Sequence, residues 1–383
     1  MNLRTVYRRA ARGRMSLGQG VLACGVALAL WHGGYFSPAR VVFAVLAVVG
    51  IPALLGRRPP RDPVFVGLAV MAAANAGSAA YWHRSDTVAA AAAAAALPVM
   101  YAIALRATGA ALAAAIAAVA SAAACVGIAA LVLHHEPAAE RIAGIWRAGG
   151  TFEYPPALAV ACVCGLACVL GLVGARELSP ITAGATVLLL LTAIALSYDR
   201  AGAVLAVVVV MLYALRLRER RRVVGVGVAA VLVAAVVAVT VARPSGAALD
   251  RHLRHGPIAA RSDIWSDAWR GVRRRPTLGF GPGGFRRIYS GASASDATRA
   301  GRAHDVVLDQ AVEAGVVAAA GAVVLLVAGL VRAARGLADD DPLVVAWACA
   351  AGAVLLSSLY DFTWSFPPLA LVAGIALARL RVE

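Results

Sequence analysis

Long apolar runs follow one another along almost the whole chain, and they constrain the possible folds more than any other feature. The runs are rich in Ala, Val and Leu, and many are about 20 residues long, which is the length that an α-helix needs to cross a bilayer. Apolar residues make up 61% of the 383 residues, above the roughly 45–50% of soluble domains. The sequence therefore predicts an all-α, polytopic integral membrane bundle.

We expect about twelve transmembrane helices, interrupted by one long polar segment. The segments are a basic tail at 1–16, nine spans within 17–242, a polar loop at 243–303, and three spans with a short tail within 304–383. The predicted spans are residues 17–33, 38–55, 63–80, 87–105, 108–133, 155–174, 180–197, 200–215, 223–242, 305–331, 342–359 and 363–380.

The positions of the 36 basic residues, all of them arginines, predict the orientation of the chain. With a cytoplasmic N-terminus, nineteen arginines fall on the inner side and five on the outer side, apart from twelve in the loop 243–303. Short inner loops carry such an excess, whereas long loops do not follow this rule. We therefore expect both termini in the cytoplasm and the long loop outside. The net charge of +16 then reflects orientation and contact with the lipid bilayer, and nucleic acid is not expected as a partner.

A basic amphipathic helix is predicted over residues 258–275 of the long loop. Its apolar residues recur at helical spacing, and Trp265 and Trp269 are typical of helices that lie on a membrane surface. Arg261 falls on this apolar side, where a lone cation is costly unless it meets an anion. The pattern fits a surface helix on anionic lipid and a binding site for phosphate equally well.

A glycine-rich turn follows at residues 278–285. Gly279, Gly281 and Gly284 match the GxGxxG spacing of dinucleotide-binding loops. The match follows Pro276 instead of a strand, which excludes a dinucleotide site. The glycines predict a tight turn or a close approach of the backbone to a ligand.

Titratable residues follow where the long loop enters the next apolar run. His304 is either a half-buried polar residue or a base, since an imidazole titrates near neutral pH. Asp305, Asp309 and Glu313 recur every fourth residue and form a carboxylate stripe on a predicted helix. Pairing with outer arginines is the simpler interpretation of this stripe, and a proton path is the alternative.

Other polar residues fall near the outer ends of other predicted spans. Arg200 begins one span directly after Asp199; the two either pair or, because adjacent residues on a helix diverge, leave Arg200 free to face a ligand. We expect a site built from the outer ends of several helices, to which these further residues belong: His134, His135, Trp146, Tyr154, Tyr360, Asp361 and Trp364.

In their order along the chain, these motifs resemble the O-antigen ligase and polymerase superfamily. The resemblance covers about residues 145–370, and three residues differ from those usual in that family: Asp305, Pro156 and Asp199. The motifs that carry it are Gly150-Thr151-Phe152 with Pro155, Ser197 to Arg200, Arg261-x-x-x-Trp265, Pro276-x-x-Gly279-x-Gly281-x-Gly283-Gly284-Phe285, His304-Asp305-x-x-Leu308, Glu313-x-Gly315 and Asp361.

The resemblance implies a metal-independent glycosyltransferase of the bacterial plasma membrane that needs no cofactor. Such an enzyme passes a glycan from an undecaprenyl-pyrophosphate carrier to a hydroxyl of an acceptor glycan or glycolipid, outside the cytoplasm and with inversion, for cell-surface polysaccharide biosynthesis. By position, Arg200 and Arg261 look like the pyrophosphate-binding arginines and His304 like the catalytic base. The residues expected to support them are Trp265, Gly279, Gly281, Asp305, Glu313 and Asp361.

Two other functions fit a chain with this many spans, namely a transporter and a non-catalytic scaffold of the cell envelope. Two six-span halves joined by a long cytoplasmic loop would favour a transporter, whereas here the long loop follows the ninth predicted span. The first outer loop, residues 32–35, has no Asp or Glu, which argues against metal-dependent lipid-sugar transferases. Ligase and polymerase differ only in the acceptor, and both stay open.

Overall fold

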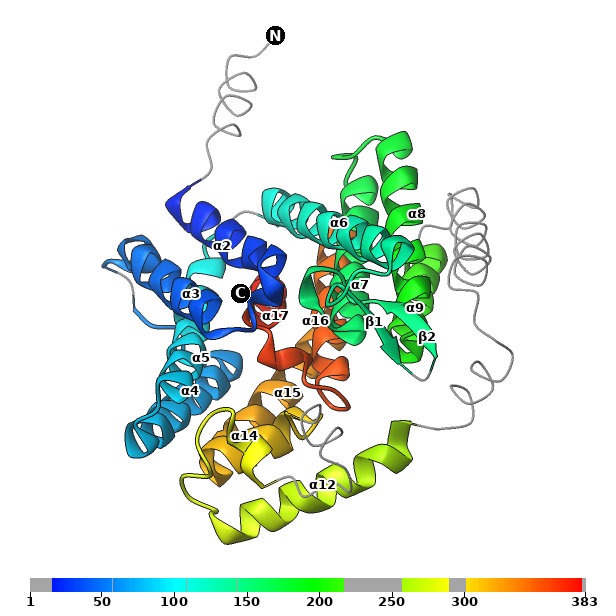
Figure 1. Cartoon of the computed structure of the whole chain (residues 1–383). Helices are drawn as coiled ribbons and strands as arrows, with labels where there is room; N and C mark the ends of the chain where they lie inside the picture. Colours follow the sequence, from blue (N-terminus) through cyan, green and yellow to red (C-terminus); the bar gives the residue numbers. More distant parts are fainter. Residues whose placement is uncertain are drawn as a thin grey trace.

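The computed structural model describes residues 16–56, 58–107, 109–142, 144–216, 257–288 and 301–380. Within these ranges the protein is a bundle of α-helices with one short β-hairpin (Figure 1). Seven of the described helices are long and apolar enough to cross a membrane, and four shorter apolar helices accompany them. The all-α membrane fold is thus confirmed, while the predicted span at 223–242 lies outside the described residues.

The helices occur close to where the apolar runs predict them. The α-helices are α2 (Leu17–Ala27), α3 (Ser37–Gly50), α4 (Pro63–Trp82), α5 (Ser85–Ala104), α6 (Gly109–Leu133), α7 (Pro155–Gly174), α8 (Pro180–Ser197), α9 (Arg200–Arg216), α12 (Pro257–Arg274), α14 (Val306–Ala314), α15 (Val316–Gly336), α16 (Pro342–Ser357) and α17 (Pro367–Arg379). The 3-10 helices are η1 (Leu28–Leu30), η2 (His32–Gly34), η3 (Ile51–Leu54), η4 (Gly150–Phe152), η5 (Gly284–Arg287) and η6 (Thr363–Ser365). The strands are β1 (Ala139–Ile142) and β2 (Ile145–Ala148), which pair antiparallel.

Local sequence sets where several of these helices begin. Asp62 accepts hydrogen bonds from the backbone N–H groups of Val64 and Phe65, and Pro63 is the first residue of α4. Ser179 caps α8 and Asp341 caps α16 in the same way, each followed by a proline. A side-chain acceptor followed by proline satisfies or removes the free N–H groups of a first helical turn.

The centre of the bundle is formed by α7, α16 and α17, whose residues are mostly buried. Helix α7 packs against α6, α8 and α16, and α15 packs along α4 and α16 (Figure 1). Small residues permit the closest contacts: a Cβ on Gly67 of α4 would lie 2.8 Å from the carbonyl oxygen of Gly321 in α15. Such glycine contacts are common between membrane helices, because they let the backbones approach closely.

The predicted single span at 305–331 is wrong. The chain forms two helices there, α14 and α15, and they are separated by Gly315 with φ 88° and ψ 177°. Only glycine adopts this conformation readily. The N–H group of Val316 donates to the carbonyl oxygen of Pro276, at 2.8 Å, instead of continuing the first helix. Helix α14 has nine residues, too few to cross a membrane.

The glycine-rich turn packs against α14 at this break. The N–H groups of Phe280 and Gly281 donate to the carbonyl oxygens of Val312 and Glu313, at 2.8 and 2.9 Å. A Cβ on Gly279 would lie 2.4 Å from the oxygen of Val312. The close backbone approach that the glycines predict is therefore to α14, and not to a ligand.

Two further expectations need correction. The last predicted span begins at residue 363, whereas Thr363–Ser365 form η6 and α17 begins at Pro367. Helix α12 forms as predicted, but its apolar side does not lie on a membrane surface. Ile264 and Ala268 are buried with Phe285 and Val312 in a small core shared with η5 and α14. Trp269 is the exception, with 54% of its surface exposed.

Candidate functional site

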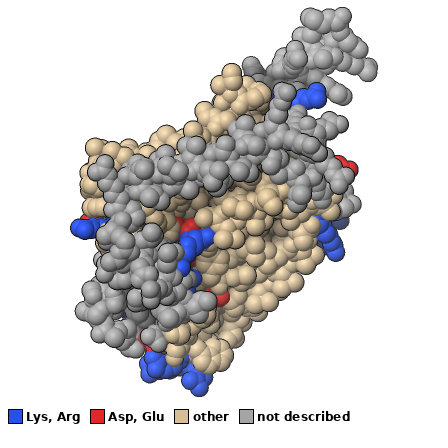
Figure 2. Space-filling model, turned by 90° about the vertical axis from the view of Figure 1, so that its right-hand side faces the viewer, with Lys and Arg blue, Asp and Glu red and all other residues tan. Residues whose placement is uncertain are grey.

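A pocket of about 580 Å³, lined by both charged and apolar residues, opens between the β-hairpin, α7, α9, α12 and the segment after α16. On the side of the molecule that is at the right of Figure 1, basic and acidic side chains lie together in a recess of a largely uncharged surface (Figure 2). The charged and tyrosine side chains that line the pocket are Arg147, Tyr154, Tyr198, Asp199, Arg200, Arg261, Tyr360 and Asp361. The pocket thus holds one more basic than acidic residue, so it suits an anion.

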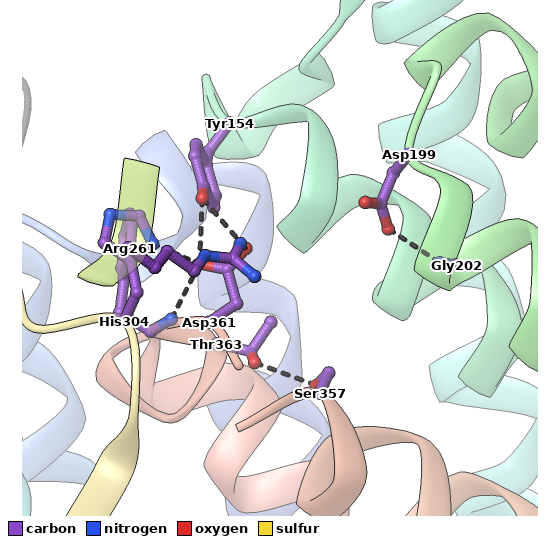
Figure 3. A network of polar contacts seen from close by, with 9 residues as sticks. Tyr154, Asp199, Gly202, Arg261, His304, Ser357, Asp361 and Thr363 are labelled. Atoms are coloured by element: carbon purple, nitrogen blue, oxygen red, sulfur yellow. Dashed lines mark hydrogen bonds and ion pairs between the residues drawn. The ribbon is translucent and has the colours of Figure 1, made fainter. Parts of the chain in front are cut away.

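Asp361 is the residue on which the site converges. Its carboxylate is 1% exposed and accepts hydrogen bonds from the Tyr154 hydroxyl, at 2.8 and 3.0 Å. Nδ1 of His304 lies 3.1 Å away, and a guanidinium nitrogen of Arg261 lies 3.6 Å away. Figure 3 shows these three side chains, which come from separate parts of the chain, pointing toward the same carboxylate. The buried charge is therefore compensated from several sides, as a buried charge requires.

His304 has the geometry of a general base. Because Nδ1 faces the Asp361 carboxylate, this contact favours the tautomer with the proton on Nδ1, and Nε2 keeps a free lone pair. The ring also meets Phe362 edge to face, with 4.9 Å between ring centroids. Its backbone φ of 53° lies in the left-handed region, where few residues other than glycine occur. The residue is thus fixed by a carboxylate and by an aromatic ring.

Arg261 and Arg200 reach the pocket from different helices. Arg261 lies on α12, near the face of Tyr360, with 5.7 Å between the guanidinium carbon and the ring centroid. The anion that this arginine needs is therefore supplied by Asp361 within the protein. Arg200 is exposed at the start of α9 and lines the same pocket. It makes no ion pair with Asp199, although the structure describes both residues; Asp199 instead accepts from the N–H group of Gly202, at 2.7 Å.

Arg147 is a third arginine of the pocket that the sequence reasoning missed. It lies on β2, and its Nε donates to the carbonyl oxygen of Ser197 at 2.8 Å. Burial lowers the pKa of its guanidinium, and the Asp199 carboxylate opposes that effect. From the sequence, Arg147 is one of the five arginines expected on the outer side of the membrane. Its place three residues before the Gly150-Thr151-Phe152 motif was the one signal available.

Burial also changes the proton affinities of the neighbouring groups. It raises the pKa of Tyr154 well above the ordinary value, and the Asp361 carboxylate raises it further. Tyr154 therefore stays protonated and acts as a donor. Burial likewise raises the pKa of Asp199, with Asp361 as a further cause. Among the residues described, no group of three or more His, Cys, Asp or Glu side chains is arranged to hold a metal ion.

The other predicted site residues do not line the pocket, and the structure shows what each of them contacts instead. Trp265 packs against the core beneath α12. Asp305 caps α14 by accepting from the N–H group of Leu308, at 2.9 Å. Glu313 binds Arg302 through two contacts of 2.6 Å. The carboxylate stripe is therefore explained at Glu313 by structural pairing with an arginine of the outer loop, and at Asp305 by helix capping.

Comparisons with known proteins point to one family. The family model described as O-antigen ligase matches residues 185–323, a range that includes Arg200, Arg261 and His304. Asp361 and Tyr154 lie outside the matched range. A comparison with curated proteins finds no match. The match supports the resemblance of this part of the chain, residues 185–323, to the O-antigen ligase and polymerase superfamily of membrane proteins that process glycans.

Proposed function

We propose that this protein transfers a glycan from an undecaprenyl-pyrophosphate carrier to a hydroxyl of an acceptor glycan or glycolipid, on the extracytoplasmic face of the bacterial plasma membrane. One observation carries the proposal. Arg200 and Arg261 line the same pocket as Asp361, and Asp361 holds His304. Cations for a diphosphate thus line the pocket, and a base for a hydroxyl contacts the buried carboxylate in its wall.

The arginines stabilise the leaving group. When the bond between the anomeric carbon and the carrier oxygen breaks, negative charge develops on the pyrophosphate. Guanidinium groups bind phosphate oxygens at two points, and fixed donors in a partly buried pocket act more strongly than solvent. The ion pair between Arg261 and Asp361 is long, at 3.6 Å. A phosphate oxygen with more charge competes with it for Arg261, so no metal ion is required by this scheme.

His304 activates the acceptor. Nε2 takes the proton of the attacking hydroxyl, while the hydroxyl oxygen forms the new bond to the anomeric carbon. Asp361 stabilises the imidazolium that results and keeps the ring oriented. Because the hydroxyl attacks the face opposite the leaving pyrophosphate, the configuration at the anomeric carbon inverts.

Substitution of the three residues tests the proposal. In proteoliposomes supplied with lipid-linked glycan and acceptor, Arg200→Ala, Arg261→Ala and His304→Ala should each lower the transfer rate, by on the order of 10²–10⁴ for the loss of a general base and 10²–10³ for the loss of one charge-stabilising group. Arg273→Ala is the matched control, because Arg273 is an exposed arginine on the same helix as Arg261. Full activity of Arg261→Ala and His304→Ala would refute the proposal.

The lipid-linked intermediates of a deletion strain decide between ligase and polymerase. Long chains that remain on the carrier identify a ligase, whereas single repeat units identify a polymerase. Mass analysis of the carrier lipids distinguishes the two.

A further inference from the structure

A second polar cavity, of about 70 Å³, lies between α3, α4, α5 and α14 and is closed by the segment around η6. It is separate from the pocket described above, since the lining residues of the two do not overlap. Its polar lining comes from Arg40, Arg302, Glu313, Asn75 and Gln310, together with Ser365. Burying polar and charged side chains costs free energy unless they are hydrogen-bonded or paired.

The charges around this cavity do not balance. Arg302 and Glu313 neutralise each other across 2.6 Å, and both are buried. Arg40 is only 8% exposed, yet no carboxylate of the described residues lies within ion-pair distance of it. Its contacts are the carbonyl oxygen of Ser365, at 3.5 Å, and the face of Tyr35, at 4.8 Å from the ring centroid. Among the residues that the structure describes, this buried positive charge therefore has no paired anion, and a buried charge without a partner is unfavourable in a folded protein.

The neighbouring acid does not supply the missing charge. Asp309 directs its carboxylate to the backbone N–H group of Ala303, at 2.6 Å, and does not line the cavity. Burial raises the pKa of Asp309 to about 7, with the Arg302 guanidinium opposing the shift and the Glu313 carboxylate adding to it. Near neutral pH, a large share of the Asp309 side chains is therefore uncharged.

The amides of the cavity offer further donors. The side-chain oxygen of Gln310 accepts from Nδ2 of Asn75 at 2.7 Å, and Nδ2 also donates to the carbonyl oxygen of Met71 at 2.8 Å. The orientation of the Gln310 amide is assigned from this hydrogen bond. Its oxygen accepts from Asn75, so its N–H groups remain available as donors. A guanidinium and a carboxamide that both donate form a cradle for an anion.

A cluster of aromatic rings separates this cavity from His304. Phe362 meets the ring of His304 and stacks on Tyr154, with 4.5 Å between the centroids of the latter pair. The ring centroid of Phe366 lies 5.8 Å from that of Phe362 and 5.1 Å from that of Tyr35. The guanidinium carbons of Arg40 and Arg302 lie 4.8 and 5.9 Å from the centroid of the Tyr35 ring.

We propose that the cavity at Arg40 binds the carboxylate of an acidic sugar, such as a uronic acid residue of the acceptor glycan. The assignment to the acceptor rests on the function proposed above, because the cavity lies across the aromatic cluster from the pocket assigned to the carrier. A single unmatched positive charge suits a carboxylate, which carries one negative charge, better than a phosphate monoester, which carries about two. Arg40 and Gln310, which both line the cavity, hold the carboxylate.

Thermal unfolding of the full-length protein in detergent tests this assignment. Free glucuronate should raise the Tm, whereas neutral glucose and acetate should not, since the first lacks the charge and the second lacks the sugar. Inorganic pyrophosphate serves as the probe for the pocket of Arg200 and Arg261, and it should raise the Tm independently. If pyrophosphate fails to do so, the proposed function is in doubt; if glucuronate acts no better than glucose or acetate, the present inference is refuted.

Three variants locate the glucuronate effect. Arg40→Gln should abolish the shift with glucuronate and keep the shift with pyrophosphate, whereas Arg141→Gln, at an exposed arginine of the β-hairpin, should keep both. Gln310→Glu places a carboxylate within the cavity, so it should raise the Tm of the free protein and block glucuronate. This variant keeps the test decisive if Arg40→Gln does not fold. Retention of the glucuronate shift in Arg40→Gln or in Gln310→Glu would overturn the proposal.

Discussion

A single buried carboxylate, that of Asp361, brings together an imidazole, a guanidinium and a phenol. The chain positions Asp361 just after α16, where the N–H group of Phe362 donates to it at 2.7 Å. These contacts fix the carboxylate before any substrate arrives. A fixed carboxylate can orient His304 and balance the positive charge that His304 gains on taking a proton.

Asp361→Asn tests this role at the scale of one residue. The amide keeps the size of the side chain but loses the charge, and it can donate to Nδ1 and so favour the wrong imidazole tautomer. We expect the turnover number to fall by about 10²–10⁴, as in other sites where a histidine base loses its carboxylate. Initial rates of glycan transfer at saturating acceptor measure this. Asp86→Asn, at an exposed aspartate paired with Arg84, should leave the rate unchanged, and an equal loss in both variants would contradict the role of Asp361.

Asp309 predicts a pH dependence of stability. Burial is the main cause that raises its pKa from 3.8 to about 7 in the folded protein, so folding favours the protonated form. The resulting stability is present in full below about pH 4 and is lost as the pH rises through about 7. Asp309→Asn can still accept from the Ala303 N–H group and stays neutral throughout. The Tm of this variant should therefore fall less than that of the wild type between pH 5 and pH 8; equal slopes would rule out the explanation.

At the scale of the elements, the break between α14 and α15 is the main difference between the predicted and the observed helices. The apolar pattern runs through Gly315 without interruption, so the sequence predicts one helix there. The break depends on a contact made far away in the sequence: the backbone at Pro276 and Thr277 occupies the space beside Gly315, where a Cβ would lie 2.0 Å from the Thr277 oxygen. Contacts between residues far apart in the sequence cannot be read from the spacing of apolar residues.

Gly279→Ala should destabilise this junction more than Gly283→Ala. Both residues have positive φ, of 60° and 76°, but an added Cβ meets the Val312 oxygen at 2.4 Å in the first case and no atom within 4 Å in the second. Both variants therefore share the cost of a left-handed residue, about 1–2 kcal/mol, and only Gly279→Ala adds a clash of about 1–3 kcal/mol. Thermal unfolding in detergent measures the difference. Equal losses of stability in the two variants would show that the turn does not depend on its contact with α14.

The sequence predicted the helices well and the site in part. Apolar runs with capping residues and prolines are local signals, and they located the described spans to within a few residues, apart from the break at Gly315 and the start of α17. Arg200, Arg261 and Asp361 lie in one pocket as expected, with His304 bound to Asp361. Arg147 and Arg40 were missed, because an arginine in a short outer segment looks the same whether it orients the chain or lines a cavity.

At the scale of the whole molecule, two positively charged cavities lie on either side of one aromatic cluster. The larger contains Arg200 and Arg261 beside Asp361, and the smaller contains Arg40. His304 contacts the cluster through Phe362. If both proposals hold, each of two glycan substrates has its own anion site and the base lies between them.

The central claim is that Arg200 and Arg261 bind the carrier pyrophosphate, whereas His304 activates the acceptor. Binding of the carrier tests this claim most directly. Native mass spectrometry of the purified full-length protein with added undecaprenyl-pyrophosphate-linked glycan measures that binding. His304→Ala should bind the carrier as the wild type does while failing to transfer the glycan, because its pyrophosphate site is intact. The double variant Arg200→Ala, Arg261→Ala should lose the bound carrier. Equal binding of the carrier by the double variant and the wild type would contradict the account.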